Sequence, residues 1–175
     1  LYVGYLNERK GLDHLIDAYR QVAAGDTRLV IVGTGPEEQR LRSRAGDRDD
    51  INFTGYVSDE RKAAYYADAD VFVLPTLHDA WGLVVNEAMY FGLPVIVTDA
   101  AGAAELVERH ENGFVVPPGD TDVLAARLGE LLEDDELRSR LGGRSGAATE
   151  VGDVSVAIEP FESAIDRLRN RRRRT

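Results

Sequence analysis

Short apolar runs alternate with amphipathic stretches along this chain. The runs are rich in Val, Ile and Phe, which is typical of strands that are covered on both faces of a sheet. The predicted strands are Leu1–Tyr5, Arg28–Gly33, Ile51–Thr54, Val71–Leu74, Pro94–Thr98 and Gly113–Val116. Between them, apolar residues recur with the spacing of one buried helix face, as from Leu12 to Ala23 and from Leu124 to Leu132. This alternation predicts an α/β fold: a Rossmann-like, doubly wound parallel sheet of about six strands with helices on both faces.

In such folds, ligands bind outside the carboxyl ends of the strands, in the loops that lead into the helices. One of these loops ends at Ser58, which is the predicted N-cap of a helix over Glu60–Ala67. The loops of interest are Tyr5–Lys10, Gly33–Pro36, Gly55–Ser58, Pro75–Trp81 and Asp99–Ala103.

The loop Gly33-Thr34-Gly35-Pro36 invites comparison with the dinucleotide-binding fingerprint. That fingerprint requires a third small residue where this chain has Glu38, and a carboxylate at the helix start would repel a pyrophosphate. Pro36 reads as the first position of a helix. We therefore disfavour a site for NAD or FAD and interpret the loop as structural or as one wall of a cleft.

The segment from Asp79 to Asp99 carries the strongest indication of chemistry. Because Gly82 makes a continuous helix unfavourable, we expect a helix to begin there, with the amides of Gly82, Leu83 and Val84 unpaired. These amides and the helix dipole form an anion site suited to a diphosphate. Glu87, one turn in, could accept two ribose hydroxyls, while Asp79 would lie where a transferred sugar sits. Taken singly, either acid could instead be an ordinary helix-start or loop carboxylate.

Taken with its neighbours, this segment resembles the C-terminal, nucleotide-sugar-binding domain of the retaining GT-B glycosyltransferases of group 1 (glycosyltransferase family 4). Around the two acids, the resemblance rests on Trp81-Gly82, Ala88-Met89, Gly92-Leu93-Pro94 and Thr98-Asp99. The other segments that carry it are Val3-Gly4, Lys10-Gly11, Val30 to Pro36, Phe53 to Val57, Ala69 to Pro75, Gly102, Glu105-Leu106-Val107, Asn112-Gly113 and Val116 to Asp120.

The resemblance implies a role for several residues. The family usually has two glutamates with seven residues between them, which fall here on Asp79, near the donor sugar, and Glu87, on the nucleotide ribose. Lys10 matches the basic residue that stabilises the departing diphosphate, and the Gly82-Leu83-Val84 amides match the diphosphate cradle. Gly55 and Val57 lie in the loop that contacts the base through its backbone.

Two positions depart from the family. Asp79 is one methylene shorter than the usual glutamate, and Tyr5 stands where a second diphosphate cation, an Arg, is usual. Arg9 is a candidate to replace that cation, although it could equally be a solvated loop charge.

The resemblance also implies transfer of a hexose from a nucleotide-diphosphate sugar with retention of anomeric configuration. It implies an N-terminal acceptor domain that is absent from this chain, whose final predicted helix, Ser155–Asn170, would pack back against it. No metal or cofactor is expected, since no His/Asp cluster has metal-ligand spacing. The alternatives that remain are a non-catalytic nucleotide-sugar-binding module and another GT-B enzyme such as a nucleotide-sugar epimerase. The base, sugar and acceptor are not assigned.

Composition adds limits to this interpretation. The chain of 175 residues begins with Leu and has no Cys, so we expect a piece of a longer protein, in the cytoplasm. A net charge of −10 argues against nucleic acid as a partner. We divide the chain into a nucleotide-sugar-binding domain, 1–165, and a basic tail, 166–175, that contains six arginines. The tail reads either as a solvated helix end or as a contact with the anionic inner face of a membrane.

Overall fold

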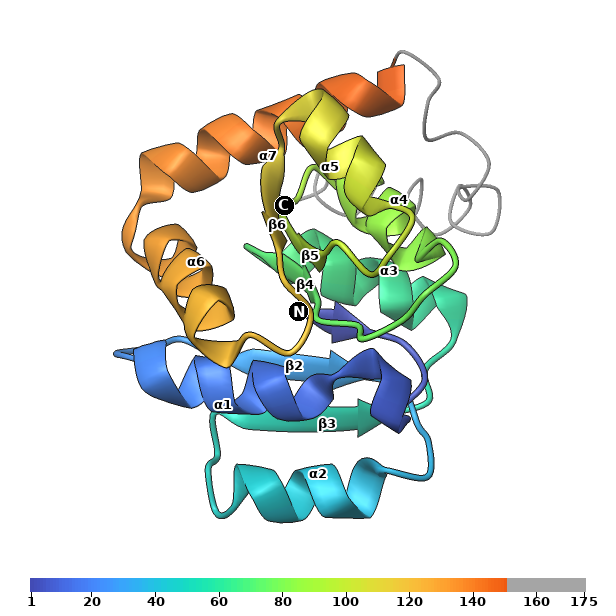
Figure 1. The fold of residues 1–175 in the computed structure, drawn as a ribbon, viewed down its shortest axis with the longest axis vertical. Coiled ribbons are helices and arrows are strands. Elements are labelled where there is room, and N and C mark those ends of the chain that lie inside the picture. The colour runs from blue at the N-terminus through green and yellow to red at the C-terminus, as the bar shows by residue number, and fades with distance from the viewer. Residues whose placement is uncertain (151–175) are drawn as a thin grey trace, which may run out of the picture.

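The computed structural model describes residues 1–150 (Figure 1). The predicted helix over Ser155–Asn170, the domain boundary after residue 165 and the arginine-rich tail all lie outside the described residues. Over the described range, no helix combines the length and hydropathy that a membrane crossing requires.

All six predicted strands are present, and every pairing between them is parallel. The strands are β1 (Tyr2–Val3), β2 (Leu29–Val32), β3 (Ile51–Gly55), β4 (Phe72–Leu74), β5 (Val95–Thr98) and β6 (Gly113–Val116). The first is shorter than predicted and spans two residues, although the amides of Gly4 and Leu6 still donate to the carbonyls of Val32 and Thr34 at 3.0 and 2.9 Å.

The strands form two three-stranded sheets, ordered β1-β2-β3 and β4-β5-β6. Leu1 joins the two, since its nitrogen donates to the carbonyl of Val71 at 2.8 Å and its carbonyl accepts from the amide of Val73 at 2.9 Å. The six strands therefore follow one another as β3-β2-β1-β4-β5-β6. This is the doubly wound order, and its direction of winding reverses between β1 and β4.

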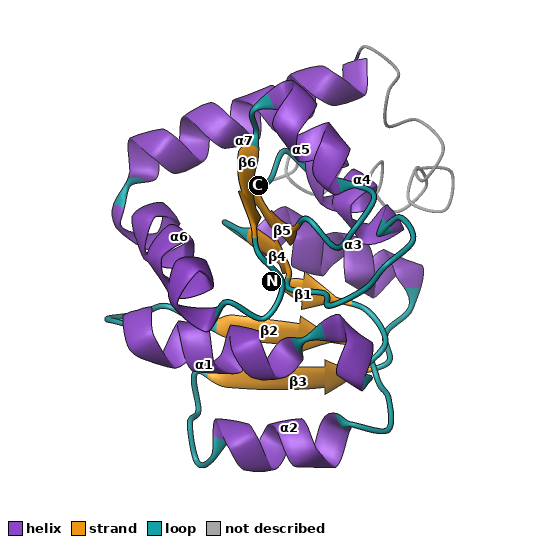
Figure 2. Ribbon diagram, viewed as in Figure 1, coloured by secondary structure: helices purple, strands orange, loops and turns teal. Residues whose placement is uncertain are grey.

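Helices cover both faces of the sheet (Figure 2). They are α1 (Leu12–Val22), α2 (Glu38–Ala45), α3 (Asp59–Asp68), α4 (Leu83–Tyr90), α5 (Ala104–His110), α6 (Thr121–Glu133) and α7 (Asp135–Glu150), with a short 3-10 helix over Glu8–Lys10. Helix α1 packs against α2 and α6 in one group. In the other group, α4 and α5 pack against α7, and Tyr66 of α3 stacks on Phe91 at the end of α4.

Two details of the helix starts differ from the sequence predictions. Helix α2 begins at Glu38, so Pro36 lies in the turn before the helix and not at its first position. Ser58 is the N-cap residue of α3 as predicted, but its side chain makes no capping hydrogen bond.

Helix α7 was not predicted, and it is held in place by a buried polar contact. The hydroxyl of Ser145 donates to the carbonyl of Leu93 at 2.6 Å and accepts from the side-chain amide of Asn112 at 2.7 Å. Gly142 lies close to the turn between α4 and β5, and a Cβ at position 142 would be 2.4 Å from the carbonyl oxygen of Gly92. The helix is thus fixed to the loops that precede β5 and β6.

Candidate functional site

The loops that follow β1 and β4 meet where the winding of the sheet reverses. The carbonyl of Arg9, in the first loop, accepts hydrogen bonds from the amide of Leu77 at 2.7 Å and the hydroxyl of Thr76 at 2.9 Å in the second. Gly11 adopts a left-handed conformation, with φ 62°, and a Cβ there would be 2.2 Å from the carbonyl oxygen of Pro75. The two loops are therefore locked together by their backbones.

Lys10 and Asp79 extend from these two loops and form an ion pair. Both side chains are about four-fifths buried, at 19% and 18% exposure. Asp79 is fixed by its backbone, since its amide donates to the carbonyl of Ala100 at 3.0 Å. The two residues that the sequence placed on the diphosphate and the sugar thus lie side by side.

Helix α4 begins directly after this pair, at Leu83, one residue after the predicted start. Gly82 is its N-cap, with φ 94°, and a Cβ there would be 2.8 Å from a methyl of the buried Leu74. The first turn closes at Val85, whose amide donates to the carbonyl of Gly82 at 2.9 Å. The amides of Leu83 and Val84 stand before that turn and have no carbonyl behind them in the helix, so they are free to bind an anion.

Glu87 lies on the same helix and is engaged by two residues of α3. Its Oε1 accepts from Lys62 Nζ at 3.1 Å, and its Oε2 accepts from the hydroxyl of Tyr66 at 2.7 Å. The sequence interpretation missed both partners. Lys62 and Tyr66 are four residues apart and therefore share one face of α3, but only the packing of α3 beside α4 reveals what that face contacts.

The remaining predicted residues lie at the same edge of the sheet. Gly55 accepts a hydrogen bond from the amide of Gly33 at 3.0 Å, which connects the loops after β2 and β3. Val57 is half-buried against the core, whereas Tyr5 is exposed. The ligand-binding roles of these residues and of Arg9 stay predictions.

Large exposed apolar side chains also gather at this edge. Tyr5 and Tyr56 follow β1 and β3, Leu77 and Trp81 lie in the loop after β4, and Leu83 begins α4. The indole of Trp81 donates to Asn86 Oδ1 at 3.0 Å, which fixes the entry into α4.

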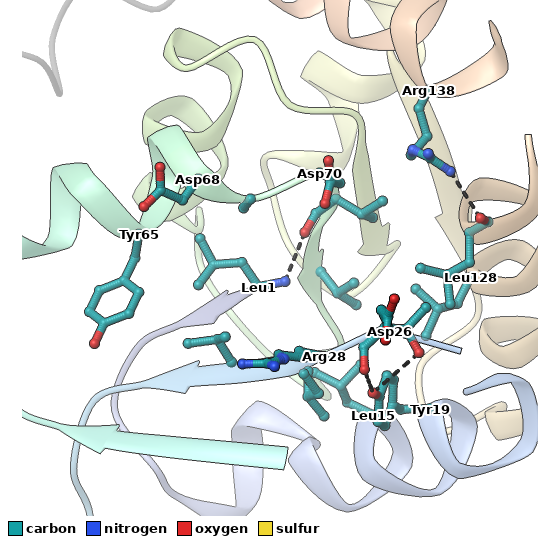
Figure 3. A pocket seen from close by; sticks show the side chains of 17 residues that line it. Leu1, Leu15, Tyr19, Asp26, Arg28, Tyr65, Asp68, Asp70, Leu128 and Arg138 are labelled. Carbon is teal, nitrogen blue, oxygen red and sulfur yellow. Dashed lines mark hydrogen bonds between the residues drawn. The ribbon is translucent and has the colours of Figure 1, made fainter. Parts of the chain in front are cut away.

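A pocket of about 490 Å³ lies at the opposite edge, where the strands begin (Figure 3). Its lining includes Leu1, Arg28, Asp70 and Arg138, and Arg138 donates to the carbonyl of Leu131. Ligands of doubly wound sheets bind at the carboxyl ends of the strands, and the predicted site residues lie there. We therefore place the candidate site at that edge and not in this pocket.

No group of three or more His, Asp or Glu side chains within residues 1–150 is arranged to hold a metal ion. The expectation that no metal is needed stays a prediction.

Comparison with known proteins gives the family of the chain. A protein-family model described as "Glycosyl transferases group 1" matches residues 1–145. The chain belongs to this family. The resemblance to the GT-B glycosyltransferases seen in the sequence is thereby confirmed, and so is the predicted fold class.

Several relatives in this family carry names that describe sugar transfer. A phosphatidyl-myo-inositol mannosyltransferase of Mycobacterium leprae is 40% identical over 161 residues, which make up 89% of this chain and 43% of that protein. An alpha-D-kanosaminyltransferase of Streptomyces kanamyceticus is 33% identical over 146 residues, or 81% of this chain and 38% of that protein. The chain thus spans less than half the length of these relatives.

Among solved structures, Anabaena HepE in complex with UDP-glucose superposes with a TM-score of 0.74. The two proteins are 27% identical, and the match covers 97% of this chain and 48% of HepE. The C-terminal domain of a group 1 family protein from Francisella tularensis, LpcC, superposes with a TM-score of 0.77 at 24% identity, which supports the fold alone.

Proposed function

We propose that this chain is the donor-binding domain of a retaining hexosyltransferase. The observation that carries the proposal is the convergence of Lys10, the free amides at the start of α4, and Glu87 at the point where the winding of the sheet reverses. A cation, a helix start and an adjacent carboxylate match the diphosphate and ribose of a nucleotide-diphosphate sugar. The complexes of HepE with UDP and with UDP-glucose support this assignment.

In this proposal each group has a distinct task. The amides of Leu83 and Val84 and the ammonium of Lys10 bind the diphosphate, and Glu87 accepts from the ribose hydroxyls. During transfer, the bond between the anomeric carbon and the diphosphate oxygen breaks, and the acceptor oxygen bonds to that carbon on the same face while its proton passes to the departing diphosphate oxygen. The electron pair of the broken bond leaves with the diphosphate, whose growing negative charge Lys10 and the helix dipole stabilise. Asp79 lies beside the donor sugar.

The acceptor site and the cellular location are further parts of the proposal. Because this chain spans less than half the length of its relatives, we propose that an N-terminal domain supplies the acceptor site. By itself, the chain should bind the donor weakly and transfer little or no sugar. We also propose a cytoplasmic location, with peripheral membrane contact through the tail as the further hypothesis to test.

Calorimetric titration of the chain tests the donor assignment. The ligands are UDP, GDP and ADP, followed by the glucose and mannose esters of whichever nucleotide binds. We expect one nucleoside diphosphate to bind in preference to its monophosphate, and Glu87→Ala to weaken that binding. Glu105→Ala is the matched control, since Glu105 is also an early-helix glutamate but is exposed and paired with Arg109. Equal binding of wild type and Glu87→Ala would contradict the proposal.

A non-catalytic nucleotide-sugar-binding module is the second candidate. It is favoured by two observations, the aspartate at position 79 and the tyrosine at position 5, where the family usually has glutamate and arginine. The variant Asp79→Ala separates the two candidates. A transferase should lose turnover in this variant, whereas a non-catalytic module should not.

A further inference from the structure

We propose that Tyr66 and Lys62 are positioning residues that set the carboxylate of Glu87 for the two hydroxyls of the nucleotide ribose. The inference rests on the proposed function and deepens it. It concerns two residues of α3 that lie behind Glu87.

Tyr66 holds one oxygen of this carboxylate from inside the core. Its side chain is fully buried, stacks on Phe91 with ring centroids 5.4 Å apart, and lies 5.9 Å from the ring of Phe72. Its hydroxyl is 2.7 Å from Glu87 Oε2 and 3.5 Å from the carbonyl of Val84, so the carboxylate is the better acceptor. The packed ring leaves the phenol little freedom, and Oε2 is therefore held at a fixed point.

The phenol keeps its proton in this environment. Burial and the neighbouring Glu87 raise the pKa of Tyr66 well above its usual value. The hydroxyl is therefore a permanent donor at physiological pH. A buried hydroxyl needs an acceptor, and Glu87 satisfies it.

Lys62 holds the other oxygen and also supplies charge. Its ammonium lies 3.1 Å from Glu87 Oε1 and 3.4 Å from the exposed Asp59. The Glu87 side chain is only 11% exposed and stands on the helix whose first amides are proposed to bind a diphosphate. An unpaired carboxylate at that depth would repel the diphosphate, and the positive charge of Lys62 offsets this repulsion.

The hydrogen bonds from Tyr66 and Lys62 leave two acceptor positions on the Glu87 carboxylate, one for each of two ribose hydroxyls. An ionised carboxylate offers about four lone-pair sites, two on each oxygen. Tyr66 takes one on Oε2 and Lys62 takes one on Oε1. One site remains on each oxygen, which suits two hydroxyls on adjacent carbons. Tyr66 and Lys62 thus orient Glu87 without touching the nucleotide.

The test compares Tyr66→Phe with Tyr65→Phe in the 175-residue chain. Tyr65 lies one position earlier on α3 and lines the pocket at the opposite edge, so it is a matched control. The ligands are the nucleoside diphosphate that binds the wild type and its 2′,3′-dideoxy analogue, measured by calorimetry. We expect Tyr66→Phe to weaken binding of the ribose form by about tenfold, the effect of one hydrogen bond to a charged group, and to leave the dideoxy form unchanged.

The preference for ribose separates the possible outcomes. Equal loss of both ligands, or no loss of either, in Tyr66→Phe would overturn the inference, because a positioning role acts only through the hydroxyls. If Glu87→Ala keeps the full preference for ribose, the proposed function fails at this residue whatever Tyr66 does. If Glu87→Ala loses that preference and Tyr66→Phe retains it, only the present inference fails. Thermal unfolding of each variant verifies that it is folded.

The variant Lys62→Met tests separately whether the positive charge of Lys62 strengthens diphosphate binding. We expect it to weaken the dideoxy diphosphate by several fold at low salt and less at high salt, because a positive charge is lost, and to weaken the ribose form further, because Oε1 of Glu87 is no longer held. Arg61→Met, at the exposed neighbouring position, is the control. A salt-independent loss in Lys62→Met would contradict the electrostatic part of the inference.

Discussion

The ammonium of Lys10 and the carboxylate of Asp79 form an ion pair across the point where the winding of the sheet reverses. The two residues are far apart in the sequence, and each belongs to a loop that backbone hydrogen bonds hold in place. In the proposed function, Lys10 binds the diphosphate. Asp79 therefore competes with the ligand for the same cation and also repels it.

Asp79→Asn should consequently bind nucleoside diphosphate more tightly than the wild-type chain. The change removes a negative charge from the site and releases Lys10, and we expect a gain of about three- to tenfold at low salt, which shrinks as salt is added. Calorimetry at two ionic strengths measures it. Asp68→Asn, at the pocket of the opposite edge, is the control and should leave the affinity unchanged. Unchanged or weaker binding in Asp79→Asn would show that Asp79 does not withhold Lys10 from the ligand.

In the longer protein proposed above, substitution of Asp79 should lower turnover although it tightens nucleotide binding. We expect Asp79→Ala to lower kcat by about a hundredfold or more although nucleotide binding is tightened, as for the loss of one electrostatic group in a transition state. Steady-state transfer of sugar from the donor identified by titration is the measurement. Turnover that survives Asp79→Ala would favour the non-catalytic module or a different role for this acid.

The start of α4 depends on the absence of a side chain at position 82. Gly82→Ala places a Cβ in a left-handed conformation, at φ 94°, and against a methyl of the buried Leu74. We expect a loss of about 1–3 kcal/mol in the free energy of unfolding and weaker diphosphate binding. Urea denaturation measures the first effect. Gly143→Ala is the matched control. A Cβ there meets no atom of the described residues 1–150 within 4 Å, so the change should stabilise α7 by about 0.5–1 kcal/mol.

The sequence was sufficient for features that depend on local periodicity. All six strands, the helix start at Gly82 and the edge that contains Lys10 and Asp79 were predicted from apolar runs, one glycine and the rule for parallel sheets. Features that depend on packing between distant elements were not predicted. Lys62 and Tyr66 contact Glu87 only because α3 packs beside α4. Helix α7 has three glycines and a weak apolar pattern, and it forms because Gly142 and Ser145 fit the loops before β5 and β6.

An acid-sensitive contribution to stability is expected from Asp50. Its carboxylate accepts from Arg48 Nε at 2.8 Å and from the hydroxyl of Tyr19 at 3.1 Å. Arg48 is the main cause that lowers the pKa of Asp50 from 3.8 to about 2. A carboxyl with a lowered pKa stabilises the folded state above its unfolded pKa, and this stability is lost as the pH falls through about 2.

The variant Asp50→Asn tests this. Because the pair lies at the surface, the difference from wild type should be at most about 1 kcal/mol near neutral pH, and it should disappear between pH 4 and about 2. Urea denaturation at a series of pH values provides the measurement. Asp49→Asn, one position earlier, is the control. A difference that persists at low pH would mean that packing and not charge is responsible.

Ser145 tests whether α7 is an integral part of the domain. In Ser145→Ala, the carbonyl of Leu93 loses its donor and the side-chain amide of Asn112 loses its acceptor, and both groups are buried. The side-chain oxygen of Asn112 is also buried and has no hydrogen-bond partner among residues 1–150, so the whole amide would be left unsatisfied. We expect a loss of about 2–4 kcal/mol in the free energy of unfolding. Ser139→Ala, at an exposed position of the same helix, should change it by less than about 0.5 kcal/mol. Equal stability of the two variants would contradict this prediction. It would mean that the hydrogen bonds of Ser145 do not stabilise the loops before β5 and β6.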